Sequence, residues 1–398
     1  MGRRKEARRR CIAQEYDKTM HITRVEPVVV GIPEYADIVM VVVHTDEGVS
    51  GVGDATLEGQ ADAVLTVLAT LAREVAGADA ARIQHLWQSL YRDPFWRPGP
   101  IRLSAMSGIE QALWDIKGKV AGLPVFDLLG GACRDELRLY ANSPVGSTPQ
   151  ELAESAVAIV ERGFDAMKLA APDATLPLDT PGSLRAAVAR CEAIRAAVGD
   201  DIALGIDLHR RLSPAMAIAF AHAVTDLGIW FLEEPTPPEA LPSIVDVARA
   251  TSIPLAAGER LLTKWAFRDL LEMRACAMVQ PDLAHCGGIL EARLIAGMAE
   301  SYGVGIAPHN PLGPVNTLAS AHLSLAVPNF VRLEHVVTHP SWCWDLVTPG
   351  LEFVGGRLQV PSGPGLGVEL NCEACAEHPP LDSRLPTFRH RDGAVADW

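Results

Sequence analysis

The sequence predicts an α/β protein built on a barrel of eight parallel strands, and two observations lead to this prediction. Short apolar runs such as ALGID, WFLEE and VGIAPH recur through the middle of the chain, and six of them close on an acidic or imidazole side chain. These side chains follow one another at intervals of 23 to 27 residues, which is the length of one strand plus one helix in a β/α barrel. The six residues are Asp207, Glu233, Glu259, Asp282, His309 and Glu334.

The chain begins with a basic segment, residues 1–20, in which seven basic side chains stand against three acidic ones. This segment lacks the apolar stretch of a secretory signal, and Met20 directly precedes the first strand-like run. We expect a disordered or spurious extension here, with a nucleic-acid-binding arm or a targeting segment as the alternatives.

Residues 21–137 are expected to form a separate α+β domain. HITRVEPVVVGI and DIVMVVVHTDEGVSGVGDA have the β-branched composition and turn signals of antiparallel strands. Helices are expected near 59–77, 81–92 and 104–121, the third with Ser104 as a possible cap. The segment DPFWRPGPIR separates the last two helices, because its Pro and Gly break any helix, and its Trp96 and Arg97 could reach a ligand.

The barrel itself is expected over residues 138–354, with amphipathic helices such as PQELAESAVAIVERG between its strands. The last segment, 355–398, is rich in glycine and proline and is expected to return to the first domain, ending at Trp398. The strands are expected near 138–142, 165–169, 203–207, 230–233, 254–257, 277–280, 304–307 and 330–334.

Composition narrows the class of protein. A chain of 398 residues that is 48% apolar can bury a barrel core and a second domain, and its formal net charge of −14 argues against nucleic acid or an anionic membrane as a partner. No window resembles a membrane span. The eight cysteines are scattered, which favours a reducing cytoplasm, and the lone CxxC at Cys372 and Cys375 has no second pair to complete a zinc site.

Three carboxylates from successive strand ends predict a metal site. Asp207, Glu233 and Glu259 would meet at one mouth of the barrel, where an ionised cluster would repel itself without a cation. Hard oxygen ligands without cysteine suit Mg²⁺ before Zn²⁺. Glu234 faces the other way from Glu233 in a regular strand, so we expect Glu234 to form a salt bridge outside the mouth.

Two histidines stand beside carboxylates. Asp207 and His209 are two residues apart on one strand end, so both side chains are expected to point to the same side. Asp282 and His309 close consecutive strands, and a carboxylate beside an imidazole orients the ring and raises its basicity, as a general base requires. The alternative for His209 is a solvated loop histidine, and the alternative for Asp282 and His309 is a structural ion pair.

Two further strand ends carry charge. Glu334 is expected either to donate a hydrogen bond to a developing oxyanion, if protonated, or to pair with Arg332 or another neighbour. Lys168 ends the second strand. If its side chain projects inward, it is suited to hold a substrate carboxylate or to contribute positive charge to the electrostatic field of the site. A structural lysine with a buried stem is the alternative. Ala170 stands where a second base would project.

Several long motifs occur in an order that resembles one known family. SGIEQALWDIKGK and GLPVFDLLGG are followed by DLH, LEEP, AAGER, QPDLAHCGG and APHNPLGP. In this the chain resembles the enolase superfamily, specifically its mandelate racemase-like branch, from about residue 22 to the C-terminus. The resemblance implies a modified TIM barrel, (β/α)7β, capped by an α+β domain that is built from both ends of the chain.

The resemblance also implies a reaction. Asp207, Glu233 and Glu259 would bind Mg²⁺, and His309 with Asp282 would take the proton next to the carboxylate of an acid sugar. His209 would then protonate the departing hydroxyl and Glu334 would stabilise the enediolate. The implied function is a sugar-acid dehydratase, a hydro-lyase that yields a 2-keto-3-deoxy acid, with D-galactonate as the leading substrate. Family members are commonly homo-oligomers.

The sequence departs from this pattern at two positions next to the site. Arg210 stands where the resemblance implies a small residue, and Asn310 replaces the expected neighbour of His309. The alternatives are dehydration of another aldonate, a racemase or epimerase on the same scaffold, and an inactive metal-binding homologue. The absence of a second lysine at Ala170 weighs against racemisation.

Overall fold

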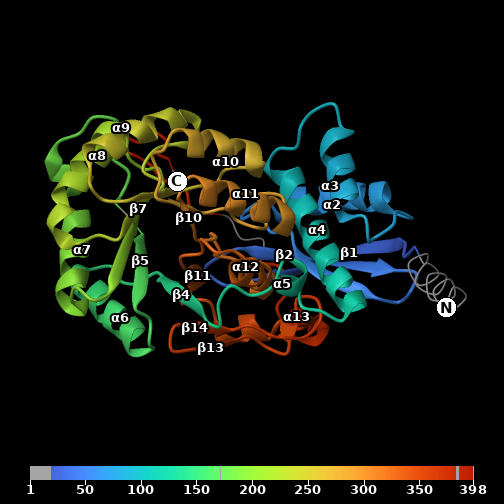
Figure 1. Ribbon diagram of the computed structural model, residues 1–398. Helices are drawn as coiled ribbons and strands as arrows, with labels where there is room; N and C mark the ends of the chain where they lie inside the picture. The colour runs from blue at the N-terminus through green and yellow to red at the C-terminus, as the bar shows by residue number, and fades with distance from the viewer. Residues whose placement is uncertain (1–18, 171, 382–384, 398) are drawn as a thin grey trace, which may run out of the picture.

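The structure is a computed structural model that describes residues 19–170, 172–381 and 385–397 (Figure 1). The basic extension expected at residues 1–20 lies outside the described residues except for its last two, and Trp398 also lies outside them. Within the described residues no helix is long and apolar enough to cross a membrane.

The N-terminal part forms an antiparallel meander covered by helices, drawn in blue at the right of Figure 1. The strands pair in the order β1–β2–β3, and apolar side chains of β2 and the helices form a hydrophobic core of their own. The elements are β1 (Ile22–Gly31), β2 (Asp37–Thr45), β3 (Ser50–Asp54), α2 (Ala61–Val75), α3 (Ile83–Arg92), α4 (Pro100–Ala121) and α5 (Val125–Leu128).

The helix expected to open at Ser104 begins four residues earlier, so that expectation was wrong. Gly99 is the N-cap of α4 and Pro100 occupies its first turn, while Ser104 is fully buried inside the helix. Proline lacks an N–H and has its φ fixed near the helical value, so it starts a helix as readily as it interrupts one. Gly122, with φ 66°, ends the helix in a left-handed conformation.

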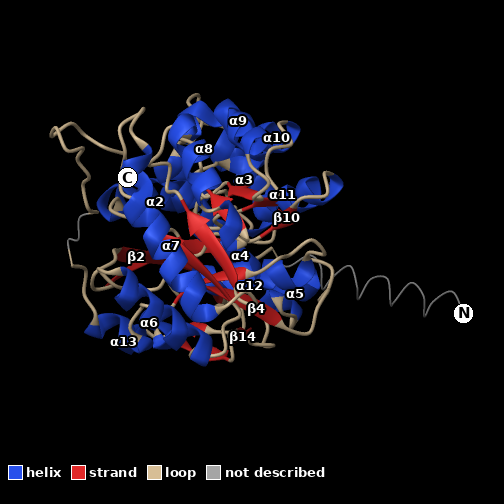
Figure 2. Cartoon of the chain, turned by 90° about the vertical axis from the view of Figure 1, so that its left-hand side faces the viewer, coloured by secondary structure: helices blue, strands red, loops and turns tan. Residues whose placement is uncertain are grey.

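A barrel of parallel strands follows, and the fold class expected from the sequence is confirmed (Figure 2). Hydrogen bonds link the strands in sequence from β4 to β10, and β11 pairs with β4 in parallel. A bridge between Ile306 and Phe330 closes the remaining gap. The strands are β4 (Leu137–Asn142), β5 (Ala166–Ala170), β6 (Ala203–Asp207), β7 (Phe231–Glu233), β8 (Leu255–Ala257), β9 (Met278–Val279), β10 (Gly305–Ile306) and β11 (Leu333–Val336).

An α-helix follows each of the first seven barrel strands, whereas β11 leads into the short helix η4 (Ser341–Asp345). This is the (β/α)7β arrangement. The helices are α6 (Pro149–Glu161), α7 (Arg185–Val198), α8 (Pro214–Ala223), α9 (Ile244–Ala250), α10 (Thr263–Glu272), α11 (Ile289–Ser301) and α12 (Pro314–Ala326), with the short helices η1 (Pro181–Leu184), η2 (Thr225–Leu227) and η3 (Pro238–Ser243) among them.

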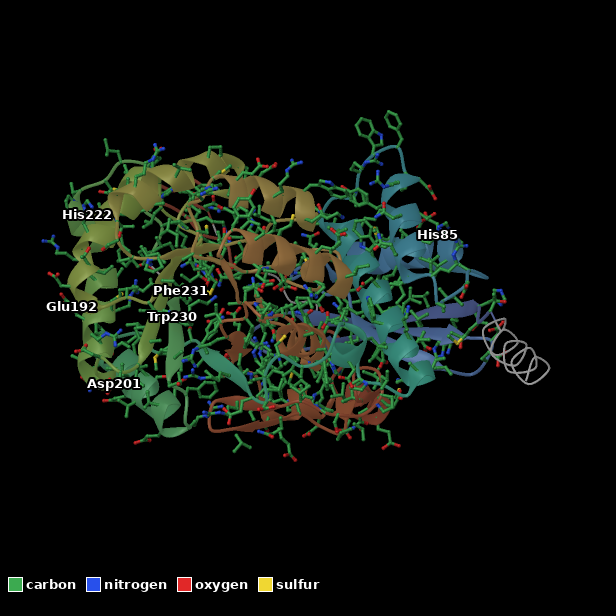
Figure 3. All side chains as sticks on the ribbon, viewed as in Figure 1. His85, Glu192, Asp201, His222, Trp230 and Phe231 are labelled. Atoms are coloured by element: carbon green, nitrogen blue, oxygen red, sulfur yellow. The ribbon has the colours of Figure 1, made fainter. Side chains whose placement is uncertain are left out.

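Side chains fill the inside of the barrel below its mouth. Tyr140 and Phe231 point inward from β4 and β7 and pack edge to face, with ring centroids 6.2 Å apart. Figure 3 shows Trp230 and Phe231 within the barrel wall, whereas Glu192 and His222 lie on its outer surface. The barrel is therefore a packed core at this level, and polar side chains gather only where the strands end.

The chain after the barrel returns to the first domain, as expected. The hairpin β13 (Glu352–Val354) and β14 (Arg357–Gln359) pairs with β4, and β12 (Val347–Thr348) pairs with β15 (Glu369–Leu370). Beyond α13 (Cys372–Glu377) the tail crosses the loop between β1 and β2. There the backbone N–H of Gly31 donates to the His378 carbonyl (3.2 Å), and the N–H of Leu381 donates to the Asp37 carboxylate (2.8 Å).

The two parts of the chain meet along α4. The Glu110 carboxylate accepts the backbone N–H groups of Ile289 (2.7 Å) and Leu290 (3.0 Å), which open α11. Trp87 Nε1 donates to the Gly287 carbonyl at 2.9 Å. A helix N-terminus has unpaired N–H groups, and here the first domain supplies the acceptor. The contact fixes the loop that follows Asp282.

Candidate active site

Asp207, Glu233 and Glu259 converge where β6, β7 and β8 end. Asp207 and Glu233 are the last residues of β6 and β7, and Glu259 stands two residues beyond β8. All three side chains are buried, and each offers an oxygen so that the three atoms lie within 4.8 Å of one another. Three carboxylate oxygens this close together are a ligand set that would suit a hard divalent cation such as Mg²⁺.

The charges of the cluster are unevenly balanced by the protein. Burial raises the pKa of Glu233, as do the Asp207 and Glu259 carboxylates, and although Lys168 opposes this the pKa is well above its usual range. Burial acts in the same direction on Glu259, but Arg210 and His309 bring its pKa down to about 2. Oε2 of Glu259 is buried and has no hydrogen-bond partner among the described residues. These features fit a divalent cation at this point.

Lys168 projects inward from β5 into the same cluster and is 2% exposed. Its Nζ lies 2.5 Å from Glu233 Oε1, 2.8 Å from Glu334 Oε1 and 3.4 Å from Asp207 Oδ2. Burial acts to lower the pKa of Lys168, but Glu233 and Glu334 raise it well above its usual value. Lys168 is therefore a charged ammonium group bound by carboxylates, and not a neutral amine.

His309 and Asp282 stand together as the sequence predicts. His309 Nδ1 lies 2.8 Å from Asp282 Oδ2, and the other Asp282 oxygen accepts the backbone N–H of Ala284 at 2.7 Å. Nε2 of His309 faces the carboxylate cluster, 3.6 Å from Glu259 Oε2. Burial acts to lower the pKa of His309, but Glu259 and the hydrogen bond to Asp282 raise it well above its ordinary value.

His209 approaches the cluster from another strand. Its Nε2 lies 2.7 Å from Asp207 Oδ2, and its backbone N–H donates to Asp207 Oδ1 at 2.8 Å. Burial acts to raise the pKa of Asp207, but His209 and Lys168 hold it well below its usual range. The backbone at His209 is left-handed, with φ 44°, so the strand has already ended. The expected proximity of the two side chains arises from this turn rather than from the pleat.

Glu334 ends in contact with Lys168 rather than with Arg332. Its Oε1 accepts from Lys168 and from Asn142 Nδ2 (2.7 Å), and its Oε2 accepts the backbone N–H of Asn310 (3.0 Å). Arg332 instead pairs with Asp165, and both residues directly precede barrel strands, at the opposite ends of β11 and β5 from the carboxylate cluster. Of the two possibilities raised by the sequence, the contacts match an ion pair with a neighbour, because both oxygens act as acceptors.

Glu234 lies inside the site and not outside it, which corrects the expectation from strand alternation. Its side chain is buried, Oε1 accepts the backbone N–H of Gly258 (2.6 Å), and Oε2 lies 3.6 Å from Arg210 Nη1. The physical reason is the backbone of Glu234, whose φ of 44° ends the strand at Glu233. Alternation holds only while the chain stays extended.

Several polar residues of the site were not found from the sequence. Asn142 ends β4 and contacts Glu334, while Gln280 Nε2 donates to Glu233 Oε2 at 2.6 Å. Both follow the rule that a residue at a barrel strand's end faces the mouth, and that signal was present at these positions too. His285, which pairs with Glu58 of the first domain, has no such signal because the contact joins distant segments.

The loop that carries Trp96 and Arg97 does not reach the site. Trp96 is 82% exposed and Phe95 is 88% exposed, and their rings pack edge to face. Arg97 donates instead to the carbonyl of Arg92 (3.2 Å), near the end of α3.

Comparisons with known proteins agree with this architecture. Residues 18–130 match the family model of the mandelate racemase/muconate lactonizing enzyme N-terminal domain, and residues 151–374 match the model described as enolase C-terminal domain-like. Proteins named D-galactonate dehydratase from Ralstonia nicotianae and Variovorax paradoxus are 41% and 40% identical to this chain. Each alignment covers 89% of this chain and 95% of the relative.

Solved structures show the same fold. An enolase superfamily member from Salmonella Typhimurium superposes with a TM-score of 0.86 at 33% identity, covering 91% of this chain and 99% of that one. An enolase from Pantoea ananatis, described with bound D-gluconate and magnesium, has a TM-score of 0.87 at 29% identity and covers 95% and 100% of the two chains. The chain therefore belongs to the mandelate racemase/muconate lactonizing enzyme family of the enolase superfamily.

Proposed function

We propose that this chain is a Mg²⁺-dependent sugar-acid dehydratase, a hydro-lyase with D-galactonate as its leading substrate. The observation that carries the proposal is the placement of two imidazoles against one carboxylate cluster. Nε2 of His309 lies 3.6 Å from Glu259, and Nε2 of His209 lies 2.7 Å from Asp207. A base and an acid beside one metal site are what removal of water from a hydroxy acid requires. The names of the relatives support the substrate class.

Asp207, Glu233 and Glu259 are the residues that would hold the cation. Bound there, Mg²⁺ would neutralise the substrate carboxylate and the charge that develops on it as the α proton leaves. The fit is supported by the hard oxygen donors, by the spacing of the three side chains and by the unpartnered Glu259 oxygen.

The protein's own groups would move the protons. Once a cation offsets the Glu259 charge that raises the pKa of His309, the neutral ring's Nε2 would take the proton from the carbon next to the carboxylate, while Asp282 holds the Nδ1–H and steadies the imidazolium. The electron pair of that C–H bond would first move toward the carboxylate, giving an enediolate, and would then form the double bond to the next carbon as the C–O bond there breaks. His209 Nε2 would give its proton to the departing hydroxyl, which leaves as water. The enol then rearranges to a 2-keto-3-deoxy acid.

Lys168 and Glu334 are proposed to support this chemistry as a pair. The Lys168 ammonium would offset the negative charge of Glu233 and of the substrate end of the site, and Glu334 would keep both Lys168 and Asn142 in place. In this arrangement Glu334 stabilises the enediolate through its neighbours rather than by donating a proton.

A racemase on the same scaffold is the nearest rival. Racemisation needs a second base on the opposite face of the substrate, and β5 offers only Lys168, which is already engaged by carboxylates. Two residues further on the strand carries Ala170, which cannot move a proton. The dehydratase is therefore the better supported reading.

The test is a substrate screen with purified, magnesium-loaded protein. D-galactonate, D-gluconate and other aldonates would each be incubated in deuterium oxide, and 2-keto-3-deoxy acids would be measured by a semicarbazide assay. We expect a keto product from at least one acid, and none from a His309→Asn variant. Deuterium uptake next to the carboxylate without a keto product would support a racemase or epimerase, and no turnover of any acid would support an inactive homologue.

We further propose that the enzyme acts in the cytoplasm as a homo-oligomer. The cysteines of the described residues are all free thiols, as expected in a reducing compartment. The exposed Phe95 and Trp96 are large apolar side chains of the kind that partner subunits cover. Light scattering on the protein as it elutes from a size-exclusion column would give its mass in solution. A monomer at micromolar concentration would contradict the proposed homo-oligomer.

A further inference from the structure

Arg210 holds an unusual backbone conformation beside the proposed metal site. It directly follows His209 and has φ 62°, in the left-handed region that favours glycine. Its backbone N–H donates to the Glu234 carbonyl at 3.0 Å, which fixes the turn after β6. A non-glycine residue in this region is strained, and such strain is tolerated where the surrounding contacts over-determine it.

Those contacts come from the guanidinium group. The Arg210 side chain is 3% exposed, so its charge must be balanced inside the protein. Nη1 donates to Oε1 of Glu259 and lies 3.6 Å from Oε2 of Glu234. Burial acts to lower the pKa of Arg210, but Glu259 and Glu234 raise it, so the group stays charged.

The two oxygens of Glu259 are therefore in different situations. Oε1 accepts from Arg210, whereas Oε2 is buried without a hydrogen-bond partner and is the oxygen nearest His309. A cation held by both oxygens would sit closer to the guanidinium than one held by Oε2 alone. Like charges repel most strongly in a buried site, so the two-oxygen arrangement is disfavoured.

We infer that Arg210 is a positioning residue that makes Glu259 a one-oxygen metal ligand and so favours Mg²⁺ over larger divalent cations. Mg²⁺ takes six oxygens at short, regular distances, whereas Ca²⁺ readily accepts both oxygens of a carboxylate at longer distances. With Oε1 engaged, Glu259 offers the geometry that suits the smaller ion. This inference rests on the metal site proposed above and adds to it the selectivity of that site.

The experiment measures selectivity by isothermal titration calorimetry on chelator-treated protein, with Mg²⁺ and Ca²⁺ in separate titrations. Removing a positive charge strengthens the binding of every cation, so only the ratio of the Ca²⁺ to the Mg²⁺ dissociation constant reports the geometry. Arg210→Gly suits the left-handed backbone, and Arg210→Lys retains the charge without the planar fork. Arg211→Gln is the matched control, because the Arg211 guanidinium lies over the Phe388 ring instead.

We expect the ratio to fall about tenfold in Arg210→Gly, to fall less in Arg210→Lys and to stay unchanged in Arg211→Gln. Arg210→Lys keeps the test valid if Arg210→Gly does not fold. An unchanged ratio in the folded Arg210 variants, with Mg²⁺ still bound by the wild type, would overturn the inference and leave the proposed function intact. A wild type that binds no Mg²⁺ would overturn the proposed metal site itself, and the inference with it.

Discussion

His285 Nε2 lies 3.5 Å from Oε2 of Glu58, although one residue follows β9 of the barrel and the other follows β3 of the capping domain. The Tyr35 hydroxyl donates to the other Glu58 oxygen at 2.9 Å. The same His285 nitrogen lies 3.8 Å from Asp282, which holds the ring of His309. A charged contact between the domains thus lies directly beside the proposed base.

Neutralising Glu58 should reduce catalysis without unfolding the protein. In Glu58→Gln the Tyr35 and His285 contacts lose their charge assistance, and a hydrogen bond to a charged group contributes about 1.5–3 kcal/mol. We expect kcat/KM to fall roughly 10- to 100-fold, measured by steady-state kinetics on the acid that the screen identifies. Glu26→Gln removes a carboxylate from an exposed pair with Arg24 and is the control. Equal activity in the two variants would contradict this prediction.

The same pair predicts how stability depends on pH. Burial acts to lower the pKa of His285, but Asp282 and Glu58 raise it to about 9. A group whose pKa is raised on folding stabilises fully below its unfolded pKa of about 6.5, and this contribution is lost as the pH rises through the folded value.

We therefore expect the melting temperature of the wild type to exceed that of His285→Gln by several degrees at pH 6.5, and the difference to shrink by pH 10.

Glu58 gives the opposite dependence of stability on pH. Burial acts to raise its pKa, but His285 lowers the pKa to about 2, so the contribution of Glu58 to stability is lost as the pH falls toward that value. Scanning calorimetry over a pH series measures the melting temperature at both the high-pH and the low-pH end. His222→Gln, a change on the outer surface shown in Figure 3, should give a difference that does not vary in this way.

Asp282→Asn should leave the metal site in place and slow the chemical step. The amide can hold only one tautomer of His309 and cannot stabilise the imidazolium that forms when the proton is taken. We expect kcat to fall on the order of 10²- to 10⁴-fold, with a Mg²⁺ dissociation constant within about threefold of wild type. A loss of Mg²⁺ binding of the same size as the loss of kcat would instead assign Asp282 to the metal site.

Metal removal should destabilise the folded chain. A ligand present at about 100 times its dissociation constant stabilises the native state by about 2.7 kcal/mol. Adding Mg²⁺ to chelator-treated protein should therefore raise the melting temperature by several degrees. Asp207→Asn should abolish that increase because it removes one of the three converging carboxylates. An undiminished increase in this variant would place the cation elsewhere.

The spacing of strand ends predicted the barrel and brought together most of the site. Lys168, Asp207 and Glu233 all stand at or near the ends of strands whose bounds in the structure lie within one residue of the predicted ones. Periodicity succeeded here because each strand and helix repeats one unit of the fold, so a fixed interval in sequence becomes a fixed place at the mouth.

The residues that sequence reasoning misplaced lie where the chain leaves the strands. Glu234 and His209 both have positive φ, and the alternation of side chains no longer applies to them. The sequence places the start of α4 four residues too late, because a proline such as Pro100 can begin a helix as well as interrupt one. The pairing of Glu58 with His285 depends on how two domains dock, which no local pattern encodes.

The C-terminal tail contacts the loop whose Tyr35 reaches the charged pair beside the proposed base. His378 and Leu381 bind Gly31 and Asp37, the two residues that flank the loop carrying Tyr35. A substitution that displaces the tail backbone would therefore move the Tyr35 hydroxyl, which donates to Glu58 beside the proposed base, without changing any residue at the barrel mouth. Changes among residues 378–381 should therefore alter turnover, although these residues lie far along the chain from the barrel strands.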